Sequence, residues 1–85
     1  MRYTHRDEIY EAEEEIAKAT LRYGDFSSTH EALGVLAEEM AELKDAIRAN
    51  ALESIRMEAI QVAAVALRLA ENCRTNTGFQ RRSGK

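Results

Sequence analysis

The fold is decided by residues 59–67, which read AIQVAAVAL. Gln61 is the one polar side chain in this stretch, so apolar residues occupy every side of a helix and not a single stripe. A helix that is apolar all round is buried on all sides. We therefore predict a buried helix over about residues 52–72. Two other helices cannot easily surround it in so short a chain, which favours self-association into a dimer or tetramer.

Two more helices are predicted before it, over about residues 4–23 and 29–50. In each, apolar residues recur at steps of three and four, which is typical of a helix with one buried stripe. Gly24 is placed to end the first helix, and Ser28 with Glu31 has the spacing of a capping box for the second. The stripes consist of Ile9, Ala12, Ile16, Ala19 and Tyr23 in the first helix and Leu33, Leu36, Met40, Leu43 and Ile47 in the second. Tyr23 is accordingly expected in the core.

The composition agrees with a helical domain. Of the 85 residues, 45% are hydrophobic but only 6% are aromatic, and there is no proline. The regularly spaced strand and turn signals of a β fold are missing from the sequence. We predict an all-α fold in which a three-helix protomer forms a helical bundle by dimerisation or tetramerisation. The helical domain covers residues 1–73, and residues 74–85 form a basic tail, either a flexible terminus or an arm that folds over an anionic ligand.

Charge and cysteine content narrow the class of protein. The net charge is −3 and the pI about 5.4, so the overall field does not favour binding to a nucleic-acid polymer. A single cysteine, Cys73, allows no internal disulfide, which fits a reducing compartment. The sequence has no charged-then-apolar leader, and its apolar runs are shorter than the roughly 20 residues of a membrane span. We expect a cytoplasmic protein with no membrane contact.

Two acidic steps lie on the second and third predicted helices. They are Glu38-Glu39-x-x-Glu42 and Glu58-x-x-Gln61. A step of three places both side chains on one face of a helix, with Cβ atoms about 5–6 Å apart. If the two helices pack together, the two pairs converge into a small cup lined by oxygen atoms.

A carboxylate on an apolar face is costly unless something neutralises it. Glu58 lies near the middle of an apolar stripe and Glu39 borders one, whereas Glu38 lies furthest from the core. One explanation is an ion pair, such as Glu58 with Arg56, with Arg68 or with a lysine of the second predicted helix. The other is a hard divalent cation, Mg²⁺ or alternatively Mn²⁺, because such ions prefer oxygen ligands. No histidine or cysteine lies near enough in the sequence to suggest zinc.

The same residues resemble the signature of the MazG-like, all-α nucleoside triphosphate pyrophosphohydrolases, which is an EExxE step, a spacer and an ExxD step. The resemblance covers roughly residues 20–73. It includes the flanking sequence Tyr23-Gly24-Asp25, His30-Glu31-Ala32 and the apolar run 62–69. It departs at Gln61, where the family has an aspartate. An amide can coordinate a cation through its oxygen but brings no charge, so this change bears on catalytic rate more than on the fold.

The resemblance implies a magnesium-dependent hydrolysis of a nucleoside triphosphate to the monophosphate and pyrophosphate. It implies Glu39, Glu42 and Glu58 as metal ligands, with Gln61 as the fourth. It also implies catalytic roles for Glu38 and Glu39, with Glu38 as the companion acid that helps to position water. Family members are typically dimers or tetramers, which agrees with the expectation from residues 59–67.

Other residues are weaker candidates for contact with the triphosphate. They are Arg22, Lys44 and Arg56, which could meet phosphates, and His30, which could stack on the base. For each of them a solvated surface position, or a capping role in the case of His30, is the simpler explanation. A second hypothesis for the whole chain is a non-catalytic, dimeric interaction or regulatory module that retains the family fold. A coiled-coil segment is less favoured, because residues 52–72 do not keep the seam of the preceding helix.

Overall fold

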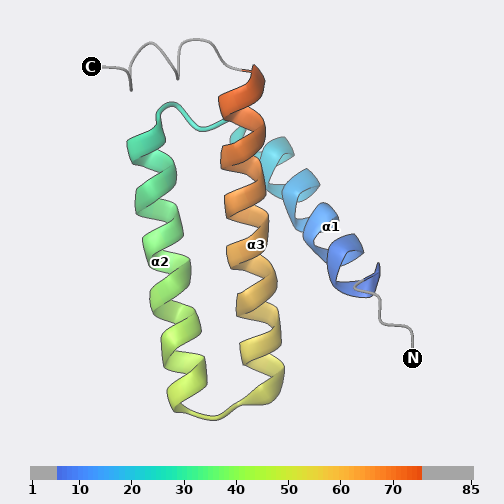
Figure 1. The fold of residues 1–85 in the computed structure, drawn as a ribbon, viewed down its shortest axis with the longest axis vertical. Helices are drawn as coiled ribbons and strands as arrows, with labels where there is room; N and C mark the ends of the chain where they lie inside the picture. The colour runs from blue at the N-terminus through green and yellow to red at the C-terminus, as the bar shows by residue number, and fades with distance from the viewer. Residues whose placement is uncertain (1–5, 76–85) are drawn as a thin grey trace.

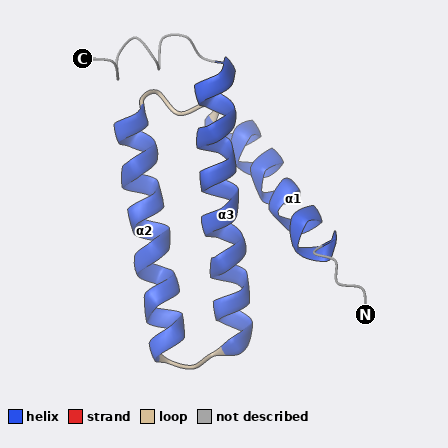
Figure 2. Ribbon diagram, in the orientation of Figure 1, coloured by secondary structure: helices blue, strands red, loops and turns tan. Residues whose placement is uncertain are grey.

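The computed structural model describes residues 6–75, and they form three helices. These are α1 (Arg6–Tyr23), α2 (Thr29–Arg48) and α3 (Leu52–Thr75). Helices α2 and α3 run side by side as an antiparallel hairpin, and α1 crosses beside α3 at an angle (Figure 1). Within the described residues every regular element is a helix, with no strand (Figure 2). The predicted all-α fold is confirmed.

The helix ends show why the chain turns where it does. Gly24 adopts φ +76°, a left-handed conformation that favours glycine, and its N–H donates to Thr20 O at 2.8 Å. Ser28 Oγ accepts from Glu31 N–H at 3.0 Å, as a capping residue does. The Glu31 carboxylate accepts from the N–H and hydroxyl of Ser27 and not from Ser28 N–H, so this capping box is shifted by one residue.

Two helix ends differ from the prediction by a few residues. α2 ends at Arg48 and not near residue 50, because Asn50 takes φ 56° and turns the chain into α3. α3 continues to Thr75, beyond the predicted end at residue 72. Residues 4–5 of the first predicted helix and residues 76–85 of the predicted tail lie outside the described residues.

The core is small and lies where the α1–α2 connection meets α2 and α3. Phe26, Ala32 and Val65 form its buried cluster, with Val35, Leu36 and Leu69 packed against it. The only aromatic ring in this cluster comes from the connection and not from a helix. The position of the connection therefore determines whether the Phe26 ring packs into the core.

Two polar side chains of α3 hold the connection in place. Asn72 Oδ1 accepts from Phe26 N–H at 2.9 Å, and Asn72 Nδ2 donates to Asp25 Oδ1 at 3.1 Å. Arg68 Nη2 donates to Gly24 O at 2.9 Å, and its guanidinium lies 4.2 Å from the centre of the Phe26 ring. Both α3 residues are buried. We call these contacts the α3 latch.

Burial of the apolar stripes is less complete than predicted. Tyr23 is 71% exposed, so the expectation that it lies in the core is wrong. The reason is that α1 packs chiefly against α3, which leaves the last turn of its stripe uncovered. In the stretch 59–67, Ile60, Ala64 and Val65 are buried but Leu67 is half-exposed. All-round burial of α3 is therefore not achieved within one protomer.

None of the helices among residues 6–75 is both long enough and apolar enough to cross a membrane.

Removal of the Asn72 amide should open the α3 latch. Asn72→Ala leaves the N–H of buried Phe26 without its acceptor and Asp25 without its donor. We expect a loss of about 2–3 kcal/mol in the free energy of unfolding, measured by urea denaturation. Cys73→Ser, at the exposed neighbouring position, is the matched control and should change it by less than about 0.5 kcal/mol. Equal stability of the two variants would contradict a structural role for the latch.

Candidate metal centre

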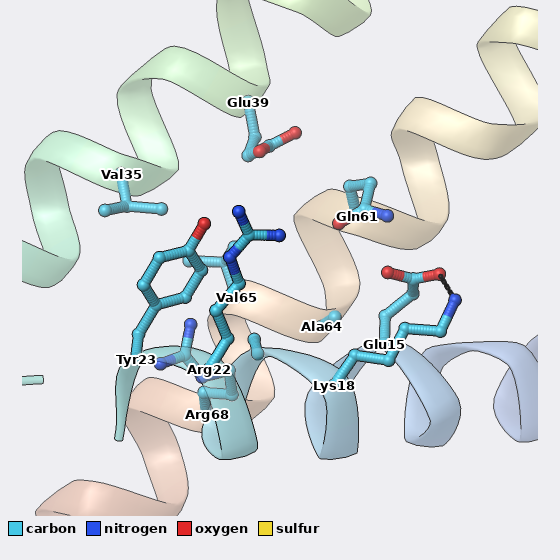
Figure 3. A pocket seen from close by; sticks show the side chains of 11 residues that line it. Glu15, Lys18, Arg22, Tyr23, Val35, Glu39, Gln61, Ala64, Val65 and Arg68 are labelled. Carbon is cyan, nitrogen blue, oxygen red and sulfur yellow. Dashed lines mark hydrogen bonds and ion pairs between the residues drawn. The ribbon is translucent and has the colours of Figure 1, made fainter. Parts of the chain in front are cut away.

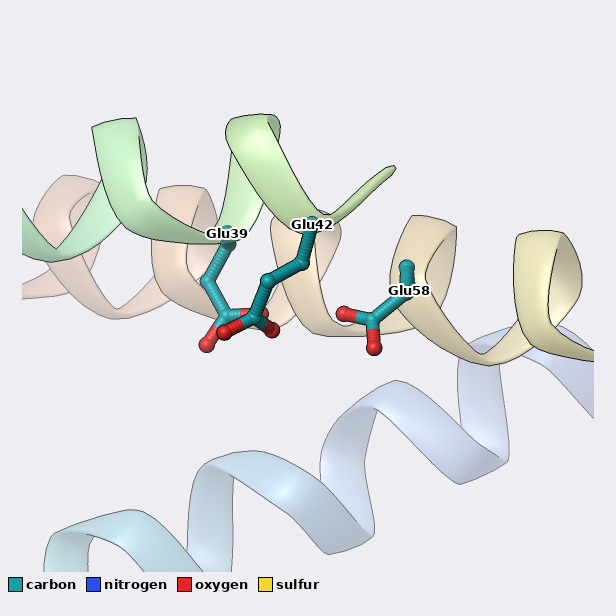
Figure 4. A group of neighbouring side chains, drawn as sticks. All are labelled: Glu39, Glu42 and Glu58. Atoms are coloured by element: carbon teal, nitrogen blue, oxygen red, sulfur yellow. The ribbon is translucent and has the colours of Figure 1, made fainter. Parts of the chain in front are cut away.

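Three glutamates of the two acidic steps converge between α2 and α3. Glu39 and Glu42 extend from α2 and Glu58 from α3 (Figure 4). One carboxylate oxygen of each lies within 4.8 Å of the other two. Divalent magnesium and calcium ions bind such oxygens at about 2.0–2.6 Å, so one ion placed between the three carboxylates could reach all of them after small side-chain rotations.

Two of these three glutamates each have a buried carboxylate oxygen without a hydrogen bond. Glu39 Oε1 and Glu58 Oε1 are each shielded from solvent and have no partner among the described residues. No arginine or lysine among residues 6–75 forms an ion pair with Glu58: Arg56 pairs instead with Glu8 at 3.2 Å and Glu11 at 2.8 Å, and Arg68 Nη2 donates to Gly24 O. The ion-pair explanation for Glu58 therefore does not hold in this structure.

The electrostatics of Glu39 reflect this crowding. Burial of its carboxylate raises its pKa above the ordinary 4.5, and the nearby charges of Glu42 and Glu58 raise it further. Glu39 is half-buried whereas Glu38 and Glu42 are exposed, so Glu39 is the deepest acid of the α2 step as the spacing predicts. An ionised Glu39 thus costs stability that a bound cation would recover.

A cavity of about 310 Å³ opens beside the carboxylates, between α1 and the hairpin. Gln61 lies one helical turn after Glu58, and both Gln61 and Glu39 line this cavity. Figure 3 shows Arg22 reaching from α1 toward Glu39 across the cavity. The remaining lining residues are Glu15, Lys18, Ala19, Tyr23, Val35, Ala64, Val65 and Arg68. Acidic and basic side chains therefore line the same cavity, and both α1 and the hairpin contribute both kinds.

A second cavity, of about 410 Å³, adjoins the first and shares Tyr23, Val35, Glu39 and Arg68 with it. It lies toward the α1–α2 connection and contains Phe26 and Glu38. Arg68 and Tyr23 thus line both cavities, and the second cavity adds the Phe26 ring and three further acids, Asp25, Glu31 and Glu38. A ligand with charged and flat aromatic parts matches this arrangement.

The remaining predicted residues lie in different places. Arg22 lines the first cavity, as a phosphate contact requires. His30 and Lys44 are exposed and line neither of the two cavities that Glu39 shares. Arg56 is held by Glu8 and Glu11 on the α1 side of α3. Their predicted substrate contacts stay predictions.

From the sequence, Arg68 is named as a possible ion-pair partner of Glu58; the structure instead places it in the lining of both cavities. A signal was present, because Arg68 follows Gln61 by seven residues, which is two helical turns on the same side of α3. Its polar character within a run of Val, Ala and Leu was a second signal.

Comparison with protein-family models, curated proteins and solved structures returned no match to this chain. The resemblance to the MazG-like family therefore stays a prediction carried by its residues and their spacing.

Neutralising Glu39 should stabilise the metal-free protein. The pKa of Glu39 in the folded protein is raised above 4.5. At pH values above this raised pKa, Glu39 is ionised and the full cost in stability is present. The cost fades as pH falls through the raised pKa toward the unfolded value. Glu39→Gln should therefore raise the melting temperature by about a few degrees at pH 7, and the gain should shrink toward pH 4.

The control is Glu38→Gln, which removes the same charge from an exposed neighbouring position and should leave the melting temperature nearly unchanged. Both variants are compared by differential scanning calorimetry in chelator, at one protein concentration. A lower melting temperature for Glu39→Gln at pH 7 would contradict the unneutralised carboxylate.

Proposed function

We propose that Glu39, Glu42 and Glu58 bind a divalent cation, Mg²⁺ or Mn²⁺, with the amide oxygen of Gln61 as a further ligand. The observation that carries this proposal is the convergence of three carboxylates, two of which keep a buried oxygen without a partner. Buried charges in proteins are paired or coordinate metals. An all-oxygen donor set without nearby histidine or cysteine suits a hard cation better than zinc.

The reaction that we propose is hydrolysis of a nucleoside triphosphate to the monophosphate and pyrophosphate. Water attacks the α-phosphorus, the bond from that phosphorus to the bridging oxygen breaks, and pyrophosphate leaves. When bound, the divalent cation would neutralise charge on the phosphates. Glu39 would hold the cation beside the reacting phosphate, and Glu38, which lines the second cavity with Glu39, helps to position the attacking water and accepts its proton. The resemblance to the MazG-like family and the two adjoining cavities that Glu39 lines support this reaction.

Gln61 supports a second candidate, a non-catalytic helical module that retains the fold. An amide in place of the family's aspartate removes one negative charge from the ligand set. A site with three charges still attracts a divalent cation but holds it less tightly. Substitution of Gln61 by aspartate separates the two candidates, because a weakened metal centre gains affinity and rate whereas a purely structural amide gains neither.

We further propose that the chain is a homo-oligomer, a dimer or tetramer. Leu33, Met40 and Ile47 of α2 are 60%, 48% and 55% exposed and lie seven residues apart, so they form one apolar stripe along the helix. On α3, Met57 and Leu67 are also at least half-exposed. A second copy that covers these side chains would complete the burial of α3 that the sequence predicts.

Hydrolysis is tested by pyrophosphate release from a panel of standard and modified nucleoside triphosphates, with and without Mg²⁺. The wild type should release pyrophosphate only with a divalent cation, and Glu58→Gln should reduce the rate by at least about a hundredfold, because the ligand set loses one of its three negative charges. Glu53→Gln, an exposed change on the first turn of the same helix, is the matched control and should retain the rate.

Two outcomes would count against the enzyme. If the wild type turns over no triphosphate with Mg²⁺ or Mn²⁺, the non-catalytic candidate is favoured. If Gln61→Asp also fails to raise the affinity for Mg²⁺, the amide is a structural group and the proposed ligand set is wrong.

Self-association is tested by light scattering coupled to size exclusion. The wild type should elute at a multiple of the 9.6 kDa chain mass. Met40→Glu places a charge in the α2 stripe and should shift the protein to the monomer with a lower melting temperature. Ala41→Glu adds the same charge at the next exposed position, about 100° around the helix, and should stay oligomeric. A monomeric wild type at micromolar concentration would contradict the proposal.

A further inference from the structure

Three cations line the first cavity together with the carboxylates of Glu15 and Glu39. They are Arg22 and Lys18 from α1 and Arg68 from α3, although the whole chain carries a net charge of −3. Lys18 is only partly available, because it forms an exposed ion pair with Glu15 at 3.4 Å. Arg22 and Arg68 are therefore the cations of this cavity that are available to bind an anionic ligand.

Arg68 is a buried cation with hydrogen-bonding capacity left over. It is 7% exposed, and its one described hydrogen bond uses Nη2, whereas a guanidinium carries five N–H donors. The Phe26 ring, 4.2 Å away, fixes the plane of the group. A guanidinium held in one orientation at a cavity wall is well suited to bind an oxyanion, because little freedom is lost when the ligand enters.

Arg22 has no ion pair and no hydrogen bond to another residue between 6 and 75; its described contact is with the Tyr23 ring, 5.5 Å from Cζ to the centroid. Its guanidinium points across the cavity toward Glu39 (Figure 3). No ion pair forms between them within 4.0 Å, so the gap between the arginine and the carboxylate is left for a ligand or solvent.

We propose that Arg22 and Arg68 together bind a phosphate group, so that a pyrophosphate-type oxyanion spans the cavity from the two guanidinium groups to the cation at Glu39. Guanidinium groups bind phosphate oxygens in pairs, through two parallel N–H donors. The volume of about 310 Å³ is at the small end of ligand pockets, which fits a phosphate moiety better than a whole nucleotide. The adjoining cavity with Phe26 then receives the rest of the substrate.

This inference rests on the proposed function for the bound cation. The positive charges of Arg22 and Arg68 would attract phosphate without the cation as well. Inorganic pyrophosphate is therefore the probe, titrated by calorimetry into the full chain with Mg²⁺ and, separately, with chelator. The wild type should bind in both conditions and more tightly with Mg²⁺. Arg22→Gln should bind about tenfold more weakly in both, as expected when one charged hydrogen-bond donor is lost.

The matched control is Arg48→Gln, which removes the same charge from the exposed end of α2 and should change the dissociation constant less than twofold. Arg68→Lys keeps the charge but loses the fork of donors, and should also weaken binding; circular dichroism checks that it folds. Loss of binding by Arg22→Gln and Arg48→Gln alike would show a diffuse charge effect and overturn the proposal.

Failure of the metal centre and failure of the phosphate contact give different results. If Mg²⁺ has no effect but binding still depends on Arg22, the phosphate site stands and the proposed metal centre falls. If Mg²⁺ alone binds the protein but pyrophosphate affinity is the same in wild type and Arg22→Gln, the metal centre stands and the phosphate site is overturned. If the wild type binds no pyrophosphate in either condition, this inference is wrong.

Discussion

The packing of α2 against α3 forces carboxylates of like charge together, and the rest of the structure is arranged around that constraint. Glu39 and Glu58 extend from facing helices, and each keeps a buried oxygen with no hydrogen-bond partner among the described residues. No described arginine or lysine pairs with either of them. A fold gains no stability from such an arrangement. The proposed cation would offset this cost.

The α3 latch connects this constraint to the position of α1. Asn72 and Arg68 tie the α1–α2 connection to α3, and the connection supplies the only aromatic side chain of the buried core cluster. Because α1 ends at the same connection, the latch also sets where Arg22 lies relative to Glu39. Arg68 takes part in both tasks, since it closes the core with Phe26 and lines both cavities. The core and the cleft thus depend on the same few side chains.

Local patterns in the sequence predicted the three helices, the cap at Ser28, the turn at Gly24 and the convergence of Glu39, Glu42 and Glu58, because each follows from spacing along one helix or from backbone chemistry. The predicted burial of Tyr23 was wrong. Whether this side chain is buried depends on whether α2 packs against the last turn of α1, which spacing along one helix does not show. The hydrogen bonds of Asn72 join residues more than 40 positions apart, and periodicity carries no information about such contacts. The sequence predicted that α3 needs a second copy to be buried on all sides, but it did not predict which side of α3 is exposed within one protomer.

We propose that a divalent cation binds between Glu39, Glu42 and Glu58. Paramagnetic broadening by Mn²⁺ tests this binding most directly. In a ¹H–¹⁵N correlation spectrum of the labelled chain, trace Mn²⁺ should first broaden the amide signals around residues 39–42 and 58–61, and excess Mg²⁺ should reverse the broadening. Broadening that begins instead at the exposed acids Glu13 and Glu14 of α1, or that is absent, would contradict the account.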